Sequence, residues 1–399
     1  MPPNKAGAVI SNPPKTHSVT PTTRTRVLPN ALVGVLTSGK SINQGIPTGK
    51  KARIFKEMML HARQKEVDLF FFYLEDVNWK QRTIKGVVLS GEKNWIMRSF
   101  PFPDIVYNRI LYRNIEKTEA ARKLLRRFEM EPEIELFNTR FLEKWEVYQA
   151  FKGSGLANDL LPETDIYSRS NLQQYCSNYP EVFLKPRNGS KGKGIIKINR
   201  DISSRGFFYA RAENAKHERW RHCSSFDSLY RELIVLGVSD KRYLVQRGIG
   251  LARYKGRVFD IRSQVQKDGG GEWIFTGAGA RVAAKHSFVT HIPNGGQLAN
   301  LQEVITEVFD ASPETISAFL ERLQNTTVMA GQILEQHMRL NLAILSLDIG
   351  IDNDGRMWIL EINSKPASFD EDDIRYRHFE YLMDYACYVG YKKNMGNDD

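Results

Sequence analysis

The chain is poor in cysteine and has no long apolar run, and each shortage excludes a class of protein. Three cysteines, Cys176, Cys223 and Cys387, are far apart and match no C-x-x-C spacing. This pattern argues against a disulfide framework and a thiolate zinc site, and it favours a reducing cytoplasm. The apolar run at 68–74 is far shorter than the roughly 20 residues of a membrane helix, so we expect no membrane span.

Acidic residues are also scarce relative to basic ones. The chain has 57 Lys and Arg against 46 Asp and Glu, a formal net charge of +11. Such an excess favours nucleic acid, an anionic surface or a phosphorylated ligand as partner. Residues 1–30 hold six of the 16 prolines and no acidic residue, which predicts a flexible basic tail.

Beyond the tail, apolar runs and helical patterns alternate as in an α/β protein. A small α/β domain is expected over residues 31–135. Its strands are predicted at 31–38, 67–74, 86–90 and 103–110, the last of these closing the sheet, and its first helix at 50–65.

A second unit is expected from about residue 136 to 240. Asn138 is predicted to cap a helix in which Phe141, Trp145 and Tyr148 recur at helical spacing, with Lys144 bordering this stripe. A helix at 169–178, strands at 182–186 and 195–199, and a glycine-rich loop at 187–194 follow. A third unit, over 241–390, is expected to contain strands at 242–249 and within 256–283, helices at 299–309, 313–339 and 371–389, and then a polar tail at 391–399.

The stretch "LSLDIGIDNDGRMWILEINSKP" (345–366) predicts a hairpin whose turn is "DNDG". We expect Ile351 to lie opposite Arg356, which places Asp348 opposite Ile359. Side chains alternate along strands, so diagonal neighbours are about 7–8 Å apart. Oxygen ligands of this kind suit Mg²⁺ beside phosphate groups. The predicted polar face contains Asp348, Glu361 and Asn363, and the apolar face contains Leu347, Ile349, Leu360 and Ile362.

Two other interpretations of these acids remain. A twelve-residue calcium loop starting at Gly350 has glycine where aspartate is required, and its flanks resemble strands rather than helices. A solvated hairpin with incidental acids leaves Glu361 unexplained between Leu360 and Ile362.

The stretch "FLKPRNGSKGKG" (183–194) places Lys185 at the end of an apolar strand and before a glycine loop. A lysine in this position can direct its ammonium at a phosphate, and glycines let backbone N–H groups approach it closely. The sequence is not a Walker A motif. A solvated turn is the alternative for this loop taken alone.

Nucleic-acid binding is a weaker interpretation of the basic charge. Lys191, Lys193, Lys197 and Arg200 lie close together before an aromatic run at 207–209, but no recognised RNA-binding motif is present. The histidines show no paired metal-ligand spacing, so His286 and His291 are not expected to bind metal.

Taken together, the motifs resemble the ATP-grasp superfamily in order and spacing. They are "FLEKWEVYQAF", "FLKP" with "NGSKGKG", "YLVQRGI", and "LSLDIG" with "WILEIN". The stretches "PDIVYNRI", "LVQRGIGLARYKGRVFDIR", "GARVA" and "IPNGG" resemble the YheC/YheD-type endospore coat-associated branch, and the resemblance covers about residues 31–390.

The resemblance implies an α+β fold with an N-terminal pre-ATP-grasp α/β domain and two subdomains that enclose ATP with Mg²⁺, or with Mn²⁺ as an alternative. The hinge carries Gln246 and Arg247 where many members have acids, so no ribose-binding carboxylate is assigned. Asp260 is expected to orient Arg262 or to join the metal site, and "NGG" (294–296) to form a backbone cradle. The implied site comprises nucleotide-binding Lys144, Lys185, Ser190, Lys191, Gly192, Gly194, Gln246, Arg247 and Ile249, metal-binding Asp348, Glu361 and Asn363, and catalytic Arg262 and Arg281.

The implied activity is that of a carboxylate–amine ligase that forms an acylphosphate from ATP and an unidentified acid. The alternative is a non-catalytic, nucleotide-binding spore-coat or assembly protein. We expect a cytoplasmic or spore-coat location, with spore-coat proteins as candidate partners and no nucleic acid.

Overall fold

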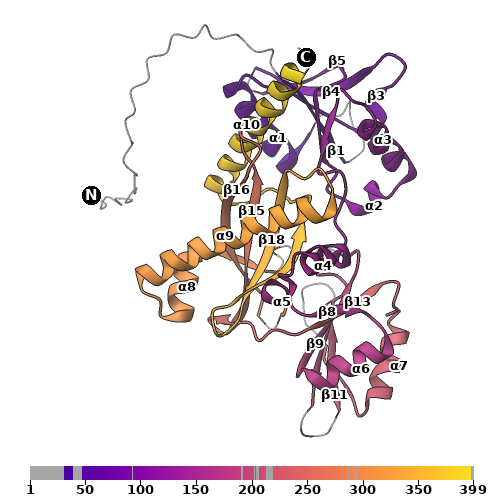
Figure 1. Cartoon of the computed structure of the whole chain (residues 1–399), viewed down its shortest axis with the longest axis vertical. Helices are drawn as coiled ribbons and strands as arrows, with labels where there is room; N and C mark the ends of the chain where they lie inside the picture. The colour runs from indigo at the N-terminus through magenta and orange to yellow at the C-terminus, as the bar shows by residue number, and fades with distance from the viewer. Residues whose placement is uncertain are drawn as a thin grey trace.

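A computed structural model of the chain contains three sheets, arranged along its long axis (Figure 1). In the part that the structure describes, no helix is long and apolar enough to cross a membrane. The tail at 1–30, Ser190, Lys191, His286, His291 and Asn294 lie outside the described residues. The described residues are 31–38, 47–91, 93–189, 192–201, 203, 206–212, 219–285, 287–290, 292 and 295–396.

The first sheet is built on the parallel strands β1 (Leu32–Thr37), β2 (Asp68–Phe72), β6 (Ile105–Arg109) and β7 (Glu135–Phe137). Because β7 pairs with β6, the expectation that 103–110 is the last strand of this sheet is wrong. The spatial order is β3 (Val77–Asn78), β4 (Thr83–Ser90), β2, β1, β6 and β7, and β5 (Asn94–Pro101) pairs with β4.

Helices cover both faces of this first sheet. The apolar side of α1 (Gly49–Gln64) packs on one face, and that of α3 (Glu119–Glu129) packs on the other. The short segment η1 (Leu74–Asp76) connects β2 to β3, and α2 (Arg113–Glu116) connects β6 to α3. This two-faced covering explains the long apolar runs of β1 and β2, whose side chains are buried on both sides.

The second sheet includes one strand from beyond the expected end of its subdomain. Strand β13 (Tyr243–Arg247) lies between β9 (Glu181–Pro186) and β8 (Thr164–Ile166), so the expected boundary at residue 240 separates β13 from the sheet to which it belongs. The spatial order is β12 (Arg221–Cys223), β11 (Phe207–Arg211), β10 (Ile196–Arg200), β9, β13 and β8, and helices α6 (Arg169–Asn178) and α7 (Phe226–Val235) pack against the sheet.

The third sheet is the central layer. Its spatial order is β17 (Gln297–Ala299), β16 (Trp273–Val282), β15 (Arg257–Lys267), β18 (Ile344–Ile351) and β19 (Met357–Asn363), with β14 (Arg253–Tyr254) paired to β15. Its core is shared with α4 (Lys144–Gly153), α5 (Ala157–Leu160), α8 (Leu301–Phe309) and α9 (Pro313–Met338). Helices α4 and α5 therefore precede the second sheet in sequence but pack on the third.

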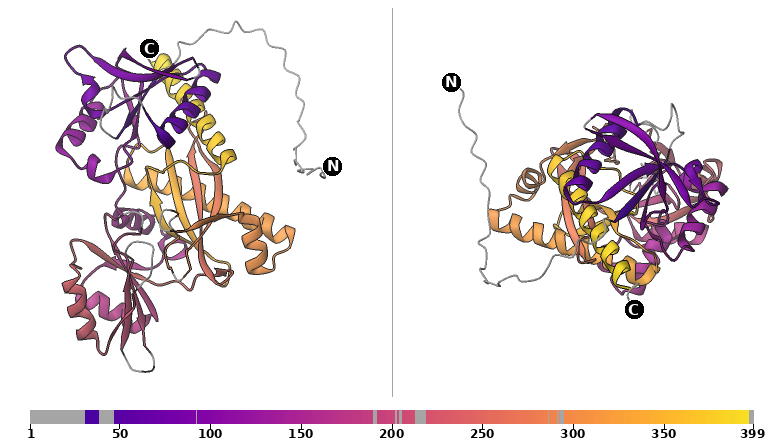
Figure 2. Two further views of the ribbon diagram at one scale, coloured as in Figure 1. Left: turned by 180° about the vertical axis from the view of Figure 1, so that it is seen from behind. Right: turned by 90° about the horizontal axis from the view of Figure 1, so that it is seen from above.

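The last helix, α10 (Asp372–Gly396), joins the third part of the molecule to the first. It continues past residue 389 into the segment expected to be a polar tail. Its apolar residues share a core with α1, and it runs from the central sheet to the N-terminal domain (Figure 2). The N-terminal domain is thus fixed to the central sheet by a buried apolar contact.

Asn138 does not cap a helix, contrary to expectation. The N-cap of α4 is Glu143, which forms a capping box with Glu146. Asn138 is fully buried with a φ of 52°. Its side chain accepts a hydrogen bond from Ala343 N and donates one to Ile344 O, at 2.9 and 2.8 Å. It therefore braces the start of β18 from a distant part of the chain.

Candidate active site

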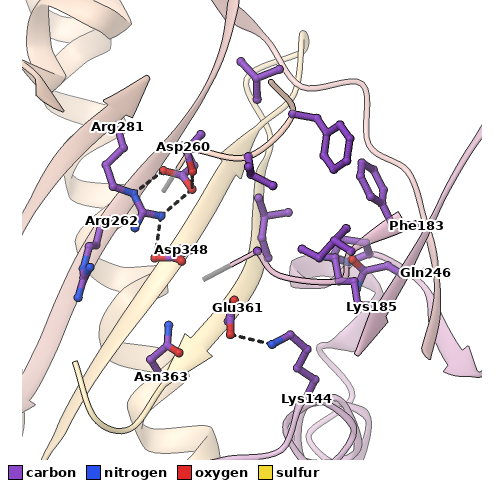
Figure 3. Close-up of a pocket in the computed structure, with 18 of the residues that line it drawn as sticks. Lys144, Phe183, Lys185, Gln246, Asp260, Arg262, Arg281, Asp348, Glu361 and Asn363 are labelled. Carbon is purple, nitrogen blue, oxygen red and sulfur yellow. Dashed lines mark hydrogen bonds and ion pairs between the residues drawn. The ribbon is translucent and has the colours of Figure 1, made fainter. Parts of the chain in front are cut away.

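A cavity of about 420 Å³ lies where the second and third sheets meet, and the N-terminal domain contributes part of its wall (Figure 3). Gly194 is not part of the lining; its carbonyl accepts a hydrogen bond from the Tyr243 hydroxyl at 3.2 Å. The expected site residues that line the cavity are Lys144, Lys185, Gly192, Gln246, Arg247, Ile249, Arg262, Arg281, Asp348, Glu361 and Asn363.

The hairpin places the two acids differently from the expected register. Ile351 pairs with Met357, and a bulge then shifts the register, so that Asp348 lies directly opposite Glu361 instead of Ile359. A bulge sets two residues against one, and here Leu360 is the extra residue. Leu360 consequently lines the cavity instead of joining the apolar face. The two carboxylates converge by direct opposition, which is closer than the diagonal arrangement that strand parity predicted.

Arg281, on β16, lies between the carboxylates of Asp260 on the adjacent strand β15 and of Asp348 on β18, the next strand beyond it. It donates two hydrogen bonds to Asp260, from Nε at 2.8 Å and from Nη2 at 2.6 Å. Its Nη2 also lies 2.9 Å from Asp348 Oδ1. The Thr290 hydroxyl donates to the second oxygen of Asp260 at 2.5 Å. Asp260 therefore orients Arg281, whereas we expected it to orient Arg262 or to join the metal site.

The charges of this cluster depend on one another. Burial alone would lower the pKa of the Arg281 guanidinium, but the carboxylates of Asp348 and Asp260 outweigh burial and raise it. Burial raises the pKa of the Asp260 carboxyl, and Arg281 opposes that rise. Burial lowers the pKa of Arg262, which donates to Ala367 O at 3.0 Å. Arg262 therefore bonds to a backbone carbonyl, whereas Arg281 pairs with the carboxylates of Asp260 and Asp348.

Lys144 begins helix α4, and its side chain reaches across the cavity to strand β19. Its Nζ donates to Glu361 Oε1 at 2.7 Å and to Gly189 O at 3.0 Å. The Lys144–Glu361 pair is visible in Figure 3, with Asn363 two residues further along the same strand as Glu361. One lysine therefore links helix α4, the loop after β9 and strand β19.

Lys185 faces the same cavity from β9. Burial and the nearby Lys144 lower its pKa to about 8, although Glu361 and Asp348 oppose this shift. Among the described residues, its ammonium forms no hydrogen bond or ion pair; the ring of Phe183 lies 5.9 Å from it. This ammonium is available to an anion in the cavity.

The end of β13 gives the cavity an amide and a guanidinium. Gln246 donates to the Thr164 hydroxyl at 2.8 Å, and the guanidinium of Arg247 lies 5.7 Å from the Trp358 ring. Apolar side chains from strands β9 and β19 and from loops also line the cavity: Phe183, Ile195, Ile249, Leu251, Phe288, Val289 and Leu360. A flat aromatic ligand fits such a lining better than a charged one does.

Comparison with known proteins agrees with this geometry. Residues 133–389 match a family model described as YheC/D like ATP-grasp, which covers more than half of the chain. The chain belongs to this ATP-grasp family. It is 27% identical over 367 residues to the endospore coat-associated protein YheD of Bacillus subtilis (strain 168), covering 90% of this chain and 79% of YheD. It is also 23% identical over 287 residues to YheC of the same strain, covering 72% of this chain and 77% of YheC.

Two solved structures of ligases share this fold. The D-cycloserine synthetase DcsG superimposes with a TM-score of 0.51 at 12% identity, covering 89% of this chain and 99% of DcsG. The VanG D-Ala:D-Ser ligase of Enterococcus faecalis superimposes with a TM-score of 0.50 at 13% identity, covering 90% of this chain and 99% of VanG. The chain therefore has the α+β ATP-grasp fold that the motifs predicted.

Sequence reasoning missed several residues of this ATP-grasp cavity, among them Arg113 and Lys365. Lys365 is buried and ion-paired with Glu116 of the N-terminal domain. Arg113 donates to Leu142 O at 2.9 Å, and its guanidinium lies 4.7 Å from the Phe141 ring. The only signal for Lys365 is its place two residues after Asn363, and Arg113 and Glu116 carry no motif.

The side chains that could bind a divalent cation have donor atoms of the kind that Mg²⁺ prefers. Within the described ranges, no group of three or more His, Cys, Asp or Glu side chains is gathered as a metal cluster. The candidate set is instead two carboxylates and the amide of Asn363, all oxygen donors of the kind that Mg²⁺ accepts with phosphate oxygens. Asp348 Oδ1 is buried and accepts no hydrogen bond from a described residue, because Arg281 approaches it without hydrogen-bond geometry.

Proposed function

We propose that this protein is an ATP- and Mg²⁺-dependent ligase that joins a carboxylate to an amine through an acylphosphate. The observation that carries the proposal is the direct opposition of Asp348 and Glu361 in a cavity that Lys144 and Lys185 enter from two other elements. In this reaction a substrate carboxylate oxygen attacks the γ-phosphorus of ATP and releases ADP. The amine then attacks the carbonyl carbon, releases phosphate and loses a proton.

In the proposal, each cation of the cavity has a phosphate to neutralise. Lys185 binds the triphosphate directly, since its ammonium has no other partner among the described residues. Lys144 binds it after releasing Glu361, which then becomes available as an oxygen ligand. Arg262 and Arg281 present planar guanidinium groups to the acylphosphate or to the transferred phosphoryl group.

Asp348, Glu361 and Asn363 would hold the Mg²⁺ ion. When bound, such an ion neutralises phosphate charge and orients the phosphate oxygens. The adenine would lie in the apolar end of the cavity near Ile249 and Leu360. Ser190, Lys191, Gly192 and Gly194 belong to the loop proposed to cover the phosphates; of these, Gly192 and Gly194 are described and have φ values of 71° and 75°.

Calorimetric titration with ATP, with and without Mg²⁺, tests the proposal. Wild-type protein should bind ATP more tightly with Mg²⁺, and Glu361→Ala should reduce this Mg²⁺ effect at least about tenfold. Asp354→Ala is the matched control, because Asp354 is an exposed acid in the turn of the same hairpin. Failure of wild-type protein to bind ATP under any metal condition would overturn the proposal.

The second candidate is a non-catalytic protein that binds nucleotide in the spore coat or during its assembly. It is favoured by the names of YheD and YheC, both described as endospore coat-associated. A cytoplasmic or spore-coat location and spore-coat protein partners belong to the proposal in both forms. ADP release measured across amino acids and peptides separates the two, since only the ligase turns over.

A further inference from the structure

Two basic side chains meet at the carboxyl ends of β1 and β6, outside the cavity described above. Thr37 and Arg109 are the last paired residues of these two strands. Lys51, in the first turn of α1, donates to Ser38 O and to the Tyr73 hydroxyl, each at 3.1 Å. Burial and then the nearby Arg109 guanidinium lower the pKa of Lys51 to about 8. The two cations are therefore close and repel each other.

Among the described residues, no carboxylate pairs with either cation. Arg109 is only 5% exposed, and its Nη2 donates to the Ser368 hydroxyl at 3.0 Å. Its Nε is buried without a hydrogen-bond partner. A buried guanidinium without an acid is unfavourable, because a hydroxyl replaces lost hydration less well than an anion does. An added anion would balance the two positive charges.

The position of the pair is one where α/β sheets bind ligands. The helix after β1 covers one face of the sheet, and the helix after β6 covers the opposite face. The chain therefore changes faces between these neighbouring parallel strands. Ligands of open α/β sheets bind at the carboxyl ends of the strands at such a switch point. Lys51 is partly exposed, which gives a ligand access to the pair.

The segment after β19 connects this pair to the cavity. Ser368, which contacts Arg109, directly follows Ala367, whose carbonyl accepts the hydrogen bond from Arg262. Asp370, two residues further on, forms an ion pair with Lys50 of α1 at 2.6 Å. A ligand at Arg109 would therefore lie beside Ser368, which directly follows Ala367 in the wall of the cavity.

We propose that Arg109 and Lys51 bind an anionic group, a carboxylate or a phosphate, of the substrate whose other end reacts beside Arg262. The proposal rests on the proposed function and names the substrate class: an acid or amine that carries a second, non-reacting anion. The two positive charges of this pair select for an anion and against a neutral substrate tail.

Calorimetric titration with two probes, inorganic phosphate and succinate, tests this site without turnover and distinguishes a phosphate from a carboxylate. At least one probe should bind to wild-type protein. Lys51→Met and Arg109→Met should each lower the affinity for that probe at least about tenfold. Lys51→Met carries the test if loss of the buried Arg109 prevents folding, because Lys51 is partly exposed.

A matched control locates the probe. Arg53→Met removes an exposed positive charge from the same helix and should keep wild-type affinity for the probe within about twofold. The inference is overturned if neither probe binds, if Lys51→Met leaves the affinity for the probe unchanged, or if Arg53→Met weakens binding as much as Lys51→Met. Failure of the proposed function is a separate result, namely absent ATP binding.

Discussion

The two sheets that face each other across the cavity match their charges differently. On the third sheet, Arg281 lies between Asp260 and Asp348, and Glu361 is paired with Lys144. On the second sheet, Lys185 has no carboxylate partner among the described residues. The acids Asp260, Asp348 and Glu361 of the third sheet have cationic partners, although Arg262 has only a backbone partner, and we call this wall the matched wall. The second sheet leaves Lys185 to be neutralised by whatever enters the cavity, and we call it the unmatched wall.

This difference indicates separate roles for the two walls. A buried charge network is tolerated when every charge has a partner in good geometry, and it holds its side chains in place before a ligand arrives. An unmatched ammonium in a partly desolvated cavity attracts anions instead. The third sheet therefore supplies preorganised geometry, and the second supplies attraction for an anion. Three measurements can break or sharpen this comparison.

Removal of the central cation of the matched wall should have the largest effect on folding. Arg281→Met leaves Asp260 and Asp348 buried without their shared partner, so the free energy of unfolding should fall by about 3–5 kcal/mol. Urea denaturation measures the change. Arg253→Met is the control, because Arg253 is exposed and bonds only a backbone carbonyl; it should change stability by less than about 0.5 kcal/mol. Equal losses in the two variants would show that the matched wall is not preorganised by Arg281.

The two lysines should differ in how much each contributes to ATP affinity. Lys185→Met removes an ammonium with no competing partner, so ATP affinity should fall roughly 10- to 100-fold. Lys144 must first release Glu361, so Lys144→Met should lower ATP affinity by a smaller factor. Calorimetry on both variants gives the ratio. A larger loss in Lys144→Met would reverse the assignment of the unmatched wall as the main anion-binding wall.

The sequence predicted the family and the fold, because motif order is a local property, and strand parity predicted that Asp348, Glu361 and Asn363 share a face; all three line the cavity. It failed on the hairpin register, since apolar alternation cannot reveal a bulge. Leu360 is apolar and fits either face, so the extra residue left no mark in the pattern. The turn is shifted by one residue from the expected register, and the bulge shifts the register by one more. The two errors cancel in parity, so Asp348 and Glu361 still lie on one face.

Long-range partners explain the other misses. An asparagine shortly before a helical pattern is typical of a cap, but Asn138 bonds backbone groups at Ala343 and Ile344. Lys365 pairs with Glu116 from another domain, and neither residue lies in a motif of its own. The sheet to which β13 belongs is likewise decided by strand pairing with β9, which a local pattern cannot indicate. These features depend on tertiary contacts between segments far apart in sequence.

The pH dependence of ATP binding gives the smallest effect and the sharpest test of the unmatched lysine. The pKa of Lys185 is about 8, so its ammonium is present below that pH and is lost as the pH rises through it. ATP affinity should therefore fall by about tenfold from about pH 7.5 to about pH 9.5, whereas an ordinary lysine would stay charged over most of this range. Bound phosphate favours the ammonium, so the fall cannot exceed the factor lost in Lys185→Met. Lys185→Arg keeps its charge throughout and should flatten the profile, as measured by calorimetry. An unchanged pH profile in Lys185→Arg would assign the titration to another group.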